Sequence, residues 1–313
     1  MTQDSTPAAG VDIGKHRLDI AFSHGAPALS VPNTPEGHAA LGAALVAHGV
    51  TRVGLEASGG YERAPVRFLR AAGLDVIVFQ PRQVHGFRTW RQRRAKTDAG
   101  DAQMLAACAA GHGPGRPGPD PRLEALAEPL RLVGQIEADI AQAKTRREAY
   151  ESEPIRAQIE AEIARLKAWR AAELKAIVAA LRAHPDLARR LTLVTSVPGI
   201  AERTALTLLV RMPELGALTR EQAAALAGLA PYDDSSGERE GERHIAGGRA
   251  DVRTALYAAA LPAAFQWNPA LVSLYKRLRA RGRKHKQALV ACARKLLIFA
   301  NTVLARGTPW VKA

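Results

Sequence analysis

Four carboxylates in the first third of the chain are placed where metal-dependent chemistry is a plausible use for them. Asp12 lies inside the apolar segment VDIG, where a lone acid is costly unless it is paired or bound to a cation. Glu56 ends the apolar run VGLEA. Asp98 and Asp101 are three residues apart in KTDAGDA, so on a helix they share one face. These hard oxygen ligands favour magnesium or manganese, provided that the elements carrying them bring them together.

The first 112 residues alternate between strand-like and helix-like segments, read from short apolar runs, helical spacing and turn residues. We expect strands at residues 10–14, 18–22, 28–31, 52–56 and 75–80, and helices at 35–48, 61–72, 81–90 and 98–111. Three strands, then helix, strand, helix, strand and helix, is the order of an α/β ribonuclease H-like fold. In that sheet the first and fourth strands are neighbours and the last helix crosses their ends. The four acids are therefore expected to converge.

Four converging carboxylates cannot all stay ionised without counter-charge. Two divalent cations about 4 Å apart would supply it, and such a pair activates a nucleophile and stabilises the leaving oxygen in phosphodiester cleavage. We therefore expect Mg²⁺ or Mn²⁺, two ions per site, bound by Asp12, Glu56, Asp98 and Asp101. Taken singly, each acid could be a cap or a surface residue, as Asp98 could be at a helix start. Four acids at these places favour the metal site.

Beyond residue 112 the chain is expected to be mainly helical, in two further segments. Residues 111–121, GHGPGRPGPDP, can only form a linker or an extended loop. Residues 113–185 comprise this linker and a charged helical arm, whose apolar stripe has 3-to-4 spacing and is interrupted at Pro154. The arm is a helical hairpin or a coiled coil, and its stripe serves dimerisation or internal packing. Residues 186–313 form a mainly α C-terminal domain.

Two segments of the C-terminal domain have recognisable patterns. Residues 193–212, LVTSVPGIAERTALTLLVRM, are typical of two apolar helices around a Pro-Gly turn. This is the shape of a helix-hairpin-helix, whose turn offers backbone N–H groups to a phosphate, but also of an αα-hairpin used for packing. Ala201 stands at the usual second glycine and weakens the DNA-binding interpretation. Residues 231–249, PYDDSSGEREGERHIAGGR, are polar and glycine-rich between helical stretches.

The chain is strongly basic, with a net charge of +14 and a pI near 10.3, and the surplus is concentrated. Residues 252–313 contain twelve Lys and Arg and no Asp or Glu, and residues 76–97 contain six basic residues and no acid. Such an unbalanced field indicates a polyanionic partner rather than a solvated face. A membrane surface fits less well, because segment 276–286 is broken by Gly282 and has no clean apolar face. Nucleic-acid contacts are expected from Arg91, Arg93, Arg94, Lys96, Arg281, Arg283, Lys284 and Lys286.

Composition disfavours several other protein classes. Apolar residues make up 47% of the chain, which is enough for ordinary cores. Cys108 and Cys292 are far apart, so neither a disulfide framework nor a cysteine zinc site is expected. No uninterrupted apolar run reaches the roughly 18 residues of a membrane span, and the charged first thirty residues have no signal-peptide core. We expect a cytoplasmic protein associated with the bacterial nucleoid.

Several segments together carry a family resemblance. They are GVDIGKHRLDIAF, EASGGYE and RRAKTDAGDA in the first part, and VTSVPGIAERTALTLL, LAGLAPYDDSSGEREGERHIAGGRADVRTALYAAALPA and WNPALVSLYKRLRARGRKHKQALVACARKLL in the last. The chain resembles the DEDD transposases of the insertion-sequence-110 family, relatives of Piv-type DNA invertases, over nearly its whole length. The resemblance implies a RuvC-like N-terminal domain with Asp12, Glu56, Asp98 and Asp101 at the DEDD positions. EASGGYE departs from the family where a Thr-Gly is common.

The resemblance also implies a nucleophilic serine in the C-terminal domain, which here is Ser236 before Gly237, with Ser235 as the alternative. Ser236 would attack a DNA phosphate and leave a phosphoserine and a free 3′-hydroxyl, which the carboxylate cluster would activate. The scissile phosphate would be bound by nearby arginines, namely Arg239, Arg243, Arg249 and Arg253. The linker and the arm separate the two halves, so the composite site is expected between subunits of a dimer or tetramer.

The family further implies a structured noncoding bridge RNA that pairs with donor and target DNA. The basic stretches are compatible with this, since RNA-guided proteins read backbone shape and leave sequence to base pairing. Two readings from other classes stay open. One is a RuvC-like metal-dependent nuclease that hydrolyses branched DNA with water, in which Ser236 is a loop residue. The other is a non-catalytic DNA- or RNA-binding protein with vestigial acids.

Overall fold

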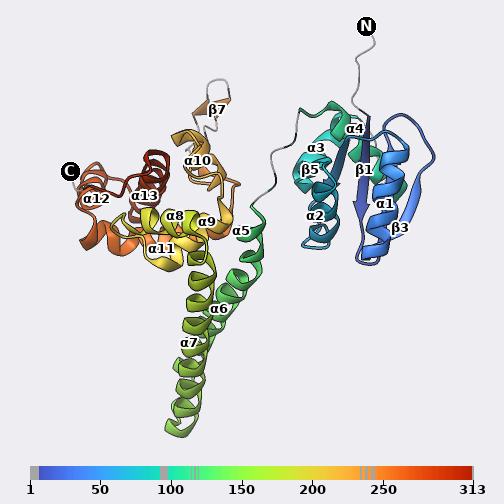
Figure 1. Cartoon of the computed structure of the whole chain (residues 1–313). Coiled ribbons are helices and arrows are strands. Elements are labelled where there is room, and N and C mark those ends of the chain that lie inside the picture. Colours follow the sequence, from blue (N-terminus) through green and yellow to red (C-terminus); the bar gives the residue numbers. More distant parts are fainter. Residues whose placement is uncertain are drawn as a thin grey trace. The chain divides into compact units, whose positions relative to one another are not determined.

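The computed structural model describes residues 7–91, 98–113, 115, 118, 120–232, 235–236, 239–240 and 244–311. For residues 98, 99, 235, 236, 239 and 240 it describes the backbone alone. By its internal contacts the chain divides into two compact units, Met1–Gly118 and Pro119–Ala313 (Figure 1). The arm expected within residues 113–185 lies in the second unit.

The first unit is built on a five-stranded mixed sheet. Its strands are β1 (Ala8–Ile13), β2 (Arg17–Phe22), β3 (Leu29–Pro32), β4 (Arg52–Glu56) and β5 (Asp75–Phe79), in the spatial order β3-β2-β1-β4-β5. Strand β1 is antiparallel to β2 and parallel to β4, and β4 is parallel to β5. The predicted element order and the pairing of the first with the fourth strand are confirmed. The sheet is compatible with a ribonuclease H-like domain.

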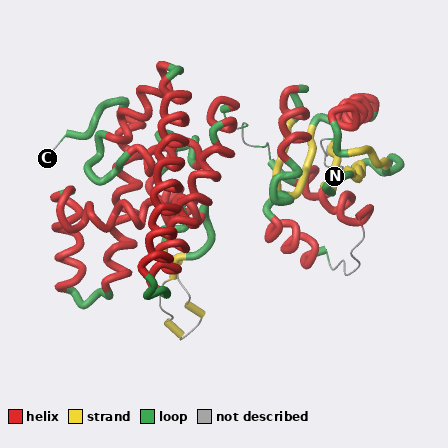
Figure 2. The backbone as a smooth tube through the Cα atoms, turned by 90° about the horizontal axis from the view of Figure 1, so that it is seen from below, coloured by secondary structure: helices red, strands yellow, loops and turns green. Residues whose placement is uncertain are grey.

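Helices cover both faces of this sheet (Figure 2). They are α1 (Pro35–Ala47), α2 (Arg63–Ala71), α3 (Pro81–Trp90) and α4 (Asp98–Gly111). On one face, Leu41 and Leu45 of α1 and Leu69 of α2 form a core with the odd-numbered residues of β1, Ala9 and Val11. On the other face, Ala8 packs with α3 and α4. Because side chains alternate along a strand, Gly10 and Asp12 lie on the same face as Ala8.

A pair of glycines lets α4 lie directly against the sheet. Gly10 of β1 and Gly54 of β4 are partners in the parallel register. A Cβ atom at Gly10 would stand 2.1 Å from the backbone oxygen of Ala102, and one at Gly54 would stand 2.9 Å from that of Leu105. No other residue type fits at such an approach without moving the helix. The glycines therefore set the distance between α4 and the ends of β1 and β4.

The second unit is mainly helical. Its helices are α5 (Pro121–Ala125), α6 (Ala127–Glu148), α7 (Glu153–Arg182), α8 (Pro185–Thr195), α9 (Glu202–Arg211), α10 (Arg220–Leu226), α11 (Ala250–Pro262), α12 (Pro269–Ala280) and α13 (His285–Arg306), with a π-helical turn η1 (Ala263–Trp267). The core includes Leu191 of α8, Leu206 of α9, Leu256 of α11 and Leu289 and Leu296 of α13, all at most 1% exposed.

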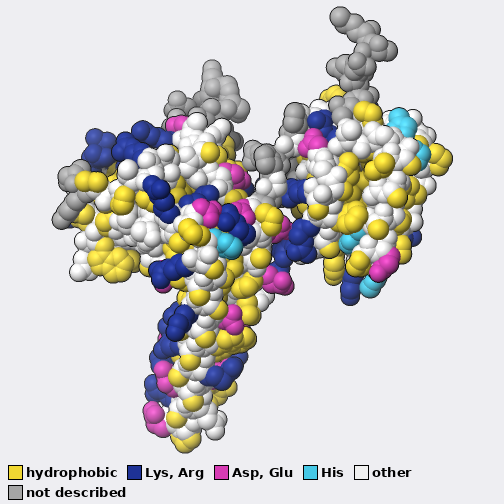
Figure 3. Space-filling view, viewed as in Figure 1, with side chains coloured by type: hydrophobic (Ala, Val, Ile, Leu, Met, Phe, Trp, Pro, Cys, Tyr) yellow, Lys and Arg dark blue, Asp and Glu magenta, His cyan; other side chains and the backbone are white. Residues whose placement is uncertain are grey.

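Helices α6 and α7 form the expected arm, a hairpin that extends from the unit (Figure 1). Its two helices pack against each other through Ile136 and Ile140 on α6 and Ile163 and Leu166 on α7. Pro154 lies in the first turn of α7, where proline is tolerated, so the predicted interruption is a helix start. Figure 3 shows side chains of both charge signs along the arm. The apolar stripe packs within the hairpin, and its use in dimerisation stays a prediction.

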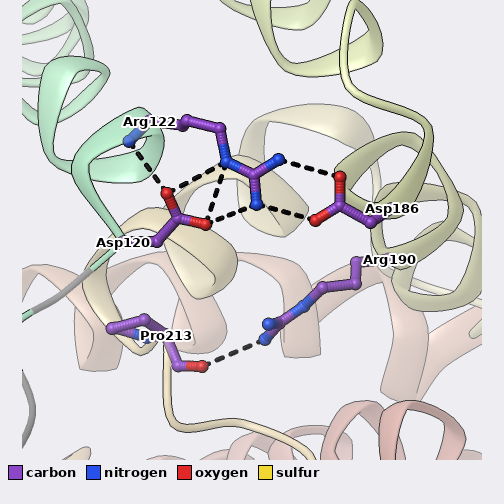
Figure 4. Close-up of polar contacts among 5 residues, drawn as sticks. All are labelled: Asp120, Arg122, Asp186, Arg190 and Pro213. Carbon is purple, nitrogen blue, oxygen red and sulfur yellow. Dashed lines mark hydrogen bonds and ion pairs between the residues drawn. The ribbon is translucent and has the colours of Figure 1, made fainter.

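The start of the second unit is held by ion pairs (Figure 4). The guanidinium of Arg122 donates to Asp120 Oδ2 at 2.7 Å and, by two nitrogens, to Asp186 on α8 at 2.8 and 2.9 Å. On the same helix as Asp186, Arg190 Nη2 donates to the carbonyl oxygens of Pro213 and Leu215 at 3.0 and 3.1 Å. These contacts fix the end of the linker to α8 and to the segment after α9.

The segment with the Pro-Gly turn forms the expected helical hairpin, α8 and α9. Gly199 in the turn has φ +101°, and a Cβ atom there would stand 2.4 Å from the Cβ of Ala263. The buried side chain of Asn268 donates to the carbonyl oxygen of Pro198 at 3.0 Å. The turn thus packs against η1 and the start of α12. These contacts favour the packing interpretation of the hairpin.

Among the described residues one helix, α13, is long and apolar enough to cross a membrane by length and composition. Half of its apolar window is buried inside the unit, and Leu289, Cys292 and Leu296 belong to the core. Arg294 and Lys295 interrupt its apolar sequence. We therefore regard α13 as a core helix.

Candidate active site

A cavity of about 410 Å³ lies where β1 and β4 end. Three of the four predicted acids line it, each from a different element: Asp12 from β1, Glu56 from the last position of β4 and Asp101 from the first turn of α4. One face of α3 also lines the cavity, through Pro81, Val84, His85 and Arg88. The segment after β4 contributes Ala57 and Ser58. The predicted convergence of Asp12, Glu56 and Asp101 is therefore present in the structure.

The glycine pair explains why these acids meet. Asp12 follows Gly10 by two residues and Glu56 follows Gly54 by two, so all four lie on the sheet face that α4 covers. Asp101 directly precedes Ala102, the residue whose backbone oxygen approaches Gly10 most closely. Asp98 begins α4, one turn earlier, and its side chain lies outside the described residues. The close approach of α4 thus places Asp101 beside the strand ends.

Arg88 on α3 binds the Asp101 carboxylate, which sequence reasoning did not foresee. Its Nη2 donates to Asp101 Oδ1, and both side chains are largely buried beside the cavity. A guanidinium at this position neutralises part of the negative charge that the acids bring together. The signal in the sequence was Arg88's place in the acid-free stretch 76–97, which also reads as a nucleic-acid contact. Only the contact between Arg88 and Asp101 in the structure distinguishes a carboxylate partner from a nucleic-acid contact.

Glu62 fixes the loop that follows Glu56. Its Oε2 accepts hydrogen bonds from Gly60 N at 2.7 Å, Ser58 N at 3.1 Å and Ser58 Oγ at 3.0 Å. Gly59 and Gly60 have φ values of +76° and +127°, which glycine adopts freely. Partial burial raises the pKa of Glu62, but these hydrogen bonds outweigh it and leave the pKa below its usual value. An ionised Glu62 therefore holds Ser58 at the cavity wall.

The predicted nucleophile lies on a β-ribbon rather than in an irregular loop. Strand β6 (Pro231–Tyr232) pairs with β9 (His244–Ile245), and β7 (Ser235–Ser236) pairs with β8 (Arg239–Glu240), all antiparallel. Figure 1 shows β7 projecting beyond α10. Ser236 is the register partner of Arg239. The side chains of Ser235, Ser236 and Arg239 lie outside the described residues. Two-residue strands are too short to show as alternation in a sequence.

Comparisons with known proteins give a family match for the segment with the carboxylate cavity and another for the segment with Ser236. Residues 9–150, which include the cavity, match a transposase family of the DEDD IS110 type. Residues 191–276, which include the ribbon, match the transposase IS116/IS110/IS902 family. The chain belongs to the IS110 family of transposases. Such transposases are enzymes that act on DNA.

Two of the relatives of this transposase match it over nearly its whole length, and a third matches less than half of it. The pilin gene-inverting proteins of Moraxella bovis and Moraxella lacunata are each 26% identical to it over 97% of both chains. An insertion element IS110 protein of 43.6 kDa from Streptomyces coelicolor is 38% identical over 134 residues, which are 42% of the transposase and 32% of that protein.

The cavity of the transposase has the donor chemistry that a divalent metal requires, and a DEDD transposase domain implies dependence on such a metal. An ion would be bound by Asp12, Glu56 and Asp101, with Asp98 one turn away on α4. Within the described part of the chain, no three His, Cys, Asp or Glu side chains are grouped closely enough to hold an ion as they stand. Asp101 is engaged by Arg88 in this arrangement. Because this ion pair uses one oxygen of Asp101, an ion would bind the other oxygen or displace Arg88.

Two predicted phosphate-binding arginines of the transposase, Arg249 and Arg253, lie after strand β9 at the start of α11. Arg249 binds both oxygens of Glu214 at 2.7 and 2.8 Å and donates to the carbonyl oxygen of Arg211 at 2.7 Å. Arg253 donates to the carbonyl oxygen of Gly247 at 2.7 Å. Gly247 belongs to the turn between the ribbon and α11. In this structure Arg249 ties the start of α11 to Arg211 and Glu214, and Arg253 ties α11 to the turn after β9. Their binding of phosphate stays a prediction.

The other predicted nucleic-acid contacts of the transposase lie on exposed surface where the structure describes them. Arg91 lies over the rings of Phe87 and Trp90, 5.4 and 5.3 Å from their centroids. Between α12 and α13, and at the start of α13, four cationic side chains are exposed: Arg281, Arg283, Lys284 and Lys286. Figure 3 shows Lys and Arg side chains gathered on the part of the unit that these helices form. Arg93, Arg94, Lys96 and Arg243 lie outside the described residues.

Proposed function

We propose that this transposase cuts and rejoins DNA strands through a phosphoserine at Ser236, with the carboxylate cavity as the other half of the active site. The observation that carries the proposal is the meeting of Asp12, Glu56 and Asp101 at one cavity. A second support is the position of Ser236 in the short strand β7, within the polar segment that precedes Arg249 and Arg253.

The chemistry is a pair of phosphoryl transfers. Ser236 Oγ attacks a DNA phosphorus, the bond from phosphorus to the 3′-oxygen breaks, and the hydroxyl proton of the serine ends on the released 3′-oxygen. In the second step a 3′-hydroxyl from another strand attacks the phosphoserine. The bond from phosphorus to Oγ then breaks, and Ser236 recovers its proton. Each step conserves one phosphodiester bond, so the strands can be rejoined without an external energy source.

The proposed role of the carboxylates is to hold the metal ions that act on the oxygen atoms of this reaction. We propose two Mg²⁺ or Mn²⁺ ions per site, bound by Asp12, Glu56, Asp98 and Asp101. When bound there, the metal supplies positive charge that activates the attacking 3′-hydroxyl and stabilises the charge developing on the phosphate. Glu62 keeps Ser58 and the loop after Glu56 in place at the cavity wall. Arg88 balances Asp101 until metal and DNA arrive.

The names of the full-length relatives favour rejoining over hydrolysis. Pilin gene-inverting proteins invert a gene, and inversion requires that each cut strand be joined to a new one. A hydrolytic nuclease would release ends and stop there. We extend recombination to this chain on that ground, with donor and target DNA as its partners.

Assembly and guidance are further parts of the proposal. The glycine-rich segment 111–121 separates the carboxylate unit from the serine unit in one chain. We propose that the site forms between subunits of a dimer or tetramer. We also propose a structured noncoding RNA that pairs with both DNA partners, because the acid-free basic surfaces suit backbone recognition without base reading. The place of action is the cytoplasm, at the nucleoid.

Covalent capture tests the proposal. Denatured wild-type protein should retain labelled DNA, and mass spectrometry should locate the nucleotide on Ser236. Ser236→Ala should lose both the adduct and strand exchange, since no other group replaces the missing oxygen. Ser235→Ala is the matched control and should keep both. A nucleotide on Ser235, or on no serine, contradicts the assignment. Cleavage by Ser236→Ala that still requires Asp12 would instead identify a hydrolytic nuclease.

A further inference from the structure

A group of aromatic side chains, most of them exposed, lies where η1, α12 and α13 meet, away from both halves of the proposed active site along the chain. Phe265 and Trp267, both on the π-helical turn η1, are 52% and 54% exposed. The Phe265 ring centroid lies 5.1 Å from that of Tyr275 on α12 and 6.2 Å from that of His285 on α13, with the latter planes 21° apart. The Tyr275 hydroxyl and His285 Nδ1 are hydrogen-bonded at 2.7 Å. We give the name ring cluster to Phe265, Tyr275 and His285, whose rings contact one another, together with the exposed Trp267 on the same turn as Phe265.

The ring cluster stands on a rigid base. Ala263 and Ala264 of η1 are at most 1% exposed. Asn268, which ends the turn, is 1% exposed and donates to the carbonyl oxygen of Pro198 while accepting from Leu271 N. π-helical turns recur at functional sites, where they direct side chains that a regular helix would turn away. Large aromatic side chains that are exposed to solvent on a well-packed turn form a surface on which a flat ligand can stack.

The surroundings of the ring cluster are cationic. His285 is flanked in sequence by Lys284 and Lys286, and the chain from residue 252 to its end contains no Asp or Glu. Arg279 donates to the carbonyl oxygen of Arg283 at 2.6 Å, which fixes the turn that carries these cations. A second copy of the chain docked here by two-fold symmetry would bring these like charges together. Charge complementarity instead favours a polyanion with exposed rings of its own.

We propose that the ring cluster is a stacking site for unpaired bases of a single DNA strand, whose phosphates contact the flanking cations. Aromatic side chains stack on any base, and a basic rim follows the backbone, which together make a sequence-tolerant single-strand site. Bases inside a duplex are already stacked and do not reach such rings. Strand exchange leaves unpaired bases between cutting and rejoining. The inference rests on the proposed function in taking DNA as the polyanion.

Binding measurements on the full-length protein test this site. The probes are a fluorescein-labelled oligothymidine of roughly 12 nucleotides and a blunt duplex of the same length, compared by anisotropy over a range of salt concentrations. Trp267→Ala and Phe265→Ala should each weaken single-strand binding about tenfold, the range that base stacking supplies. Duplex affinity should stay within a factor of about two, and the salt dependence should keep its slope, because no phosphate contact is lost.

Two controls belong to the design. Tyr150→Ala removes another exposed aromatic side chain, on the arm, and should leave both affinities unchanged. Trp267→Phe keeps a ring and should retain most of the single-strand affinity. Unchanged single-strand binding in Trp267→Ala and Phe265→Ala would overturn the proposal, and so would an equal loss on duplex DNA. A change of oligomeric state in these variants, seen by light scattering, would identify a contact between copies and overturn it too.

The result does not depend on catalysis. Asp12→Asn, which should lose strand cleavage, should bind the oligothymidine as tightly as the wild type. If recombination fails for every variant while the ring substitutions still weaken single-strand binding, the stacking site stands and the proposed reaction does not. If recombination proceeds and the ring substitutions leave single-strand binding unchanged, the reaction stands and the stacking site does not.

Discussion

At the scale of single residues, the cavity is governed by competition for Asp101. Asp101 has a cation already, since Arg88 binds one of its oxygens, and it lines the same cavity as Asp12 and Glu56. A guanidinium and a divalent ion cannot use the same carboxylate lone pairs at once. Metal binding at Asp101 therefore either displaces Arg88 or places a second positive charge beside it, and both carry a cost. DNA phosphate offers Arg88 an alternative partner, so metal and DNA should favour each other's binding.

Removing Arg88 should expose this competition. Arg88→Ala should bind Mn²⁺ several-fold more tightly than the wild type, because the competing positive charge beside Asp101 is then removed. DNA should strengthen Mn²⁺ binding in the wild type and have little effect on it in the variant. Isothermal titration with Mn²⁺, in the presence and absence of duplex DNA, measures both. Arg82→Ala, on the same helix and outside the set of residues that line the cavity, is the matched control. Weaker Mn²⁺ binding in Arg88→Ala would show that Arg88 supports the site instead.

At the scale of elements, the approach of α4 to the sheet positions the acids. The helix lies against two strand glycines, Gly10 and Gly54, which are register partners. Its buried contact residues include Ala102, Ala106 and Ala109, each at most 1% exposed. Small residues on both sides permit this close contact, and Asp101 reaches the ends of β1 and β4 because of it. The close contact of α4 with Gly10 and Gly54 thus helps to determine the geometry of the site, although neither glycine is a catalytic residue.

A single added methyl group at Gly10 should disturb the contact between α4 and the sheet. Gly10→Ala would place a Cβ atom 2.1 Å from the backbone oxygen of Ala102, which cannot move without the helix. The free energy of unfolding of the first unit should fall by about 2 kcal/mol or more, and strand cleavage should fall with it. Gly86→Ala, a helical glycine with nothing within 4 Å of the added atom, should be neutral or stabilising. Equal unfolding midpoints in urea for the two variants would show that the contact between α4 and Gly10 does not stabilise the first unit.

The ion pairs at the start of the second unit make a prediction about pH. The hydrogen bonds from Arg122 hold the pKa of Asp120 and of Asp186 below the usual carboxyl value. A lowered folded-state pKa contributes stability above the unfolded-state value, and this contribution is lost as pH falls through the folded-state value. Arg122→Gln should therefore lower Tm at neutral pH, and the difference should shrink in acid. Calorimetry from pH 7 to below about pH 4 checks this. A difference that persists unchanged in acid would rule out the ion pairs as its cause.

Sequence reasoning predicted the order of the elements in the first unit and the convergence of four acids, of which three line one cavity in the structure. It succeeded there because short apolar strands bounded by turns, and helices begun by Pro35 and Pro81, are local signals. It did not foresee the close contact of α4 with Gly10 and Gly54, since a glycine inside a strand does not by itself show which helix packs against it. It did not foresee the pairing of Arg88 with Asp101 or the two-residue strands around Ser236. Contacts between segments distant in sequence decide those features.

At the scale of the whole molecule, the account joins two units that a glycine- and proline-rich linker separates. The carboxylate cavity lies in Met1–Gly118 and the serine ribbon in Pro119–Ala313. Each unit has its own core, so each can keep its half of the site in order without the other. We propose that the halves meet across subunits. A reaction of this kind needs both halves, but it does not need both from the same chain.

Complementation between two inactive variants tests this central claim most directly. Asp12→Asn removes the acid of one half and Ser236→Ala removes the nucleophile of the other, and each protein alone should form no covalent DNA adduct. Mixed under conditions that allow subunit exchange, they form pairs in which one intact cavity faces one intact serine. The account predicts recovery of adduct to about a quarter of the wild-type level, for random two-fold pairing. Activity in either variant alone, or a mixed sample that exchanges subunits and stays inactive, would contradict it.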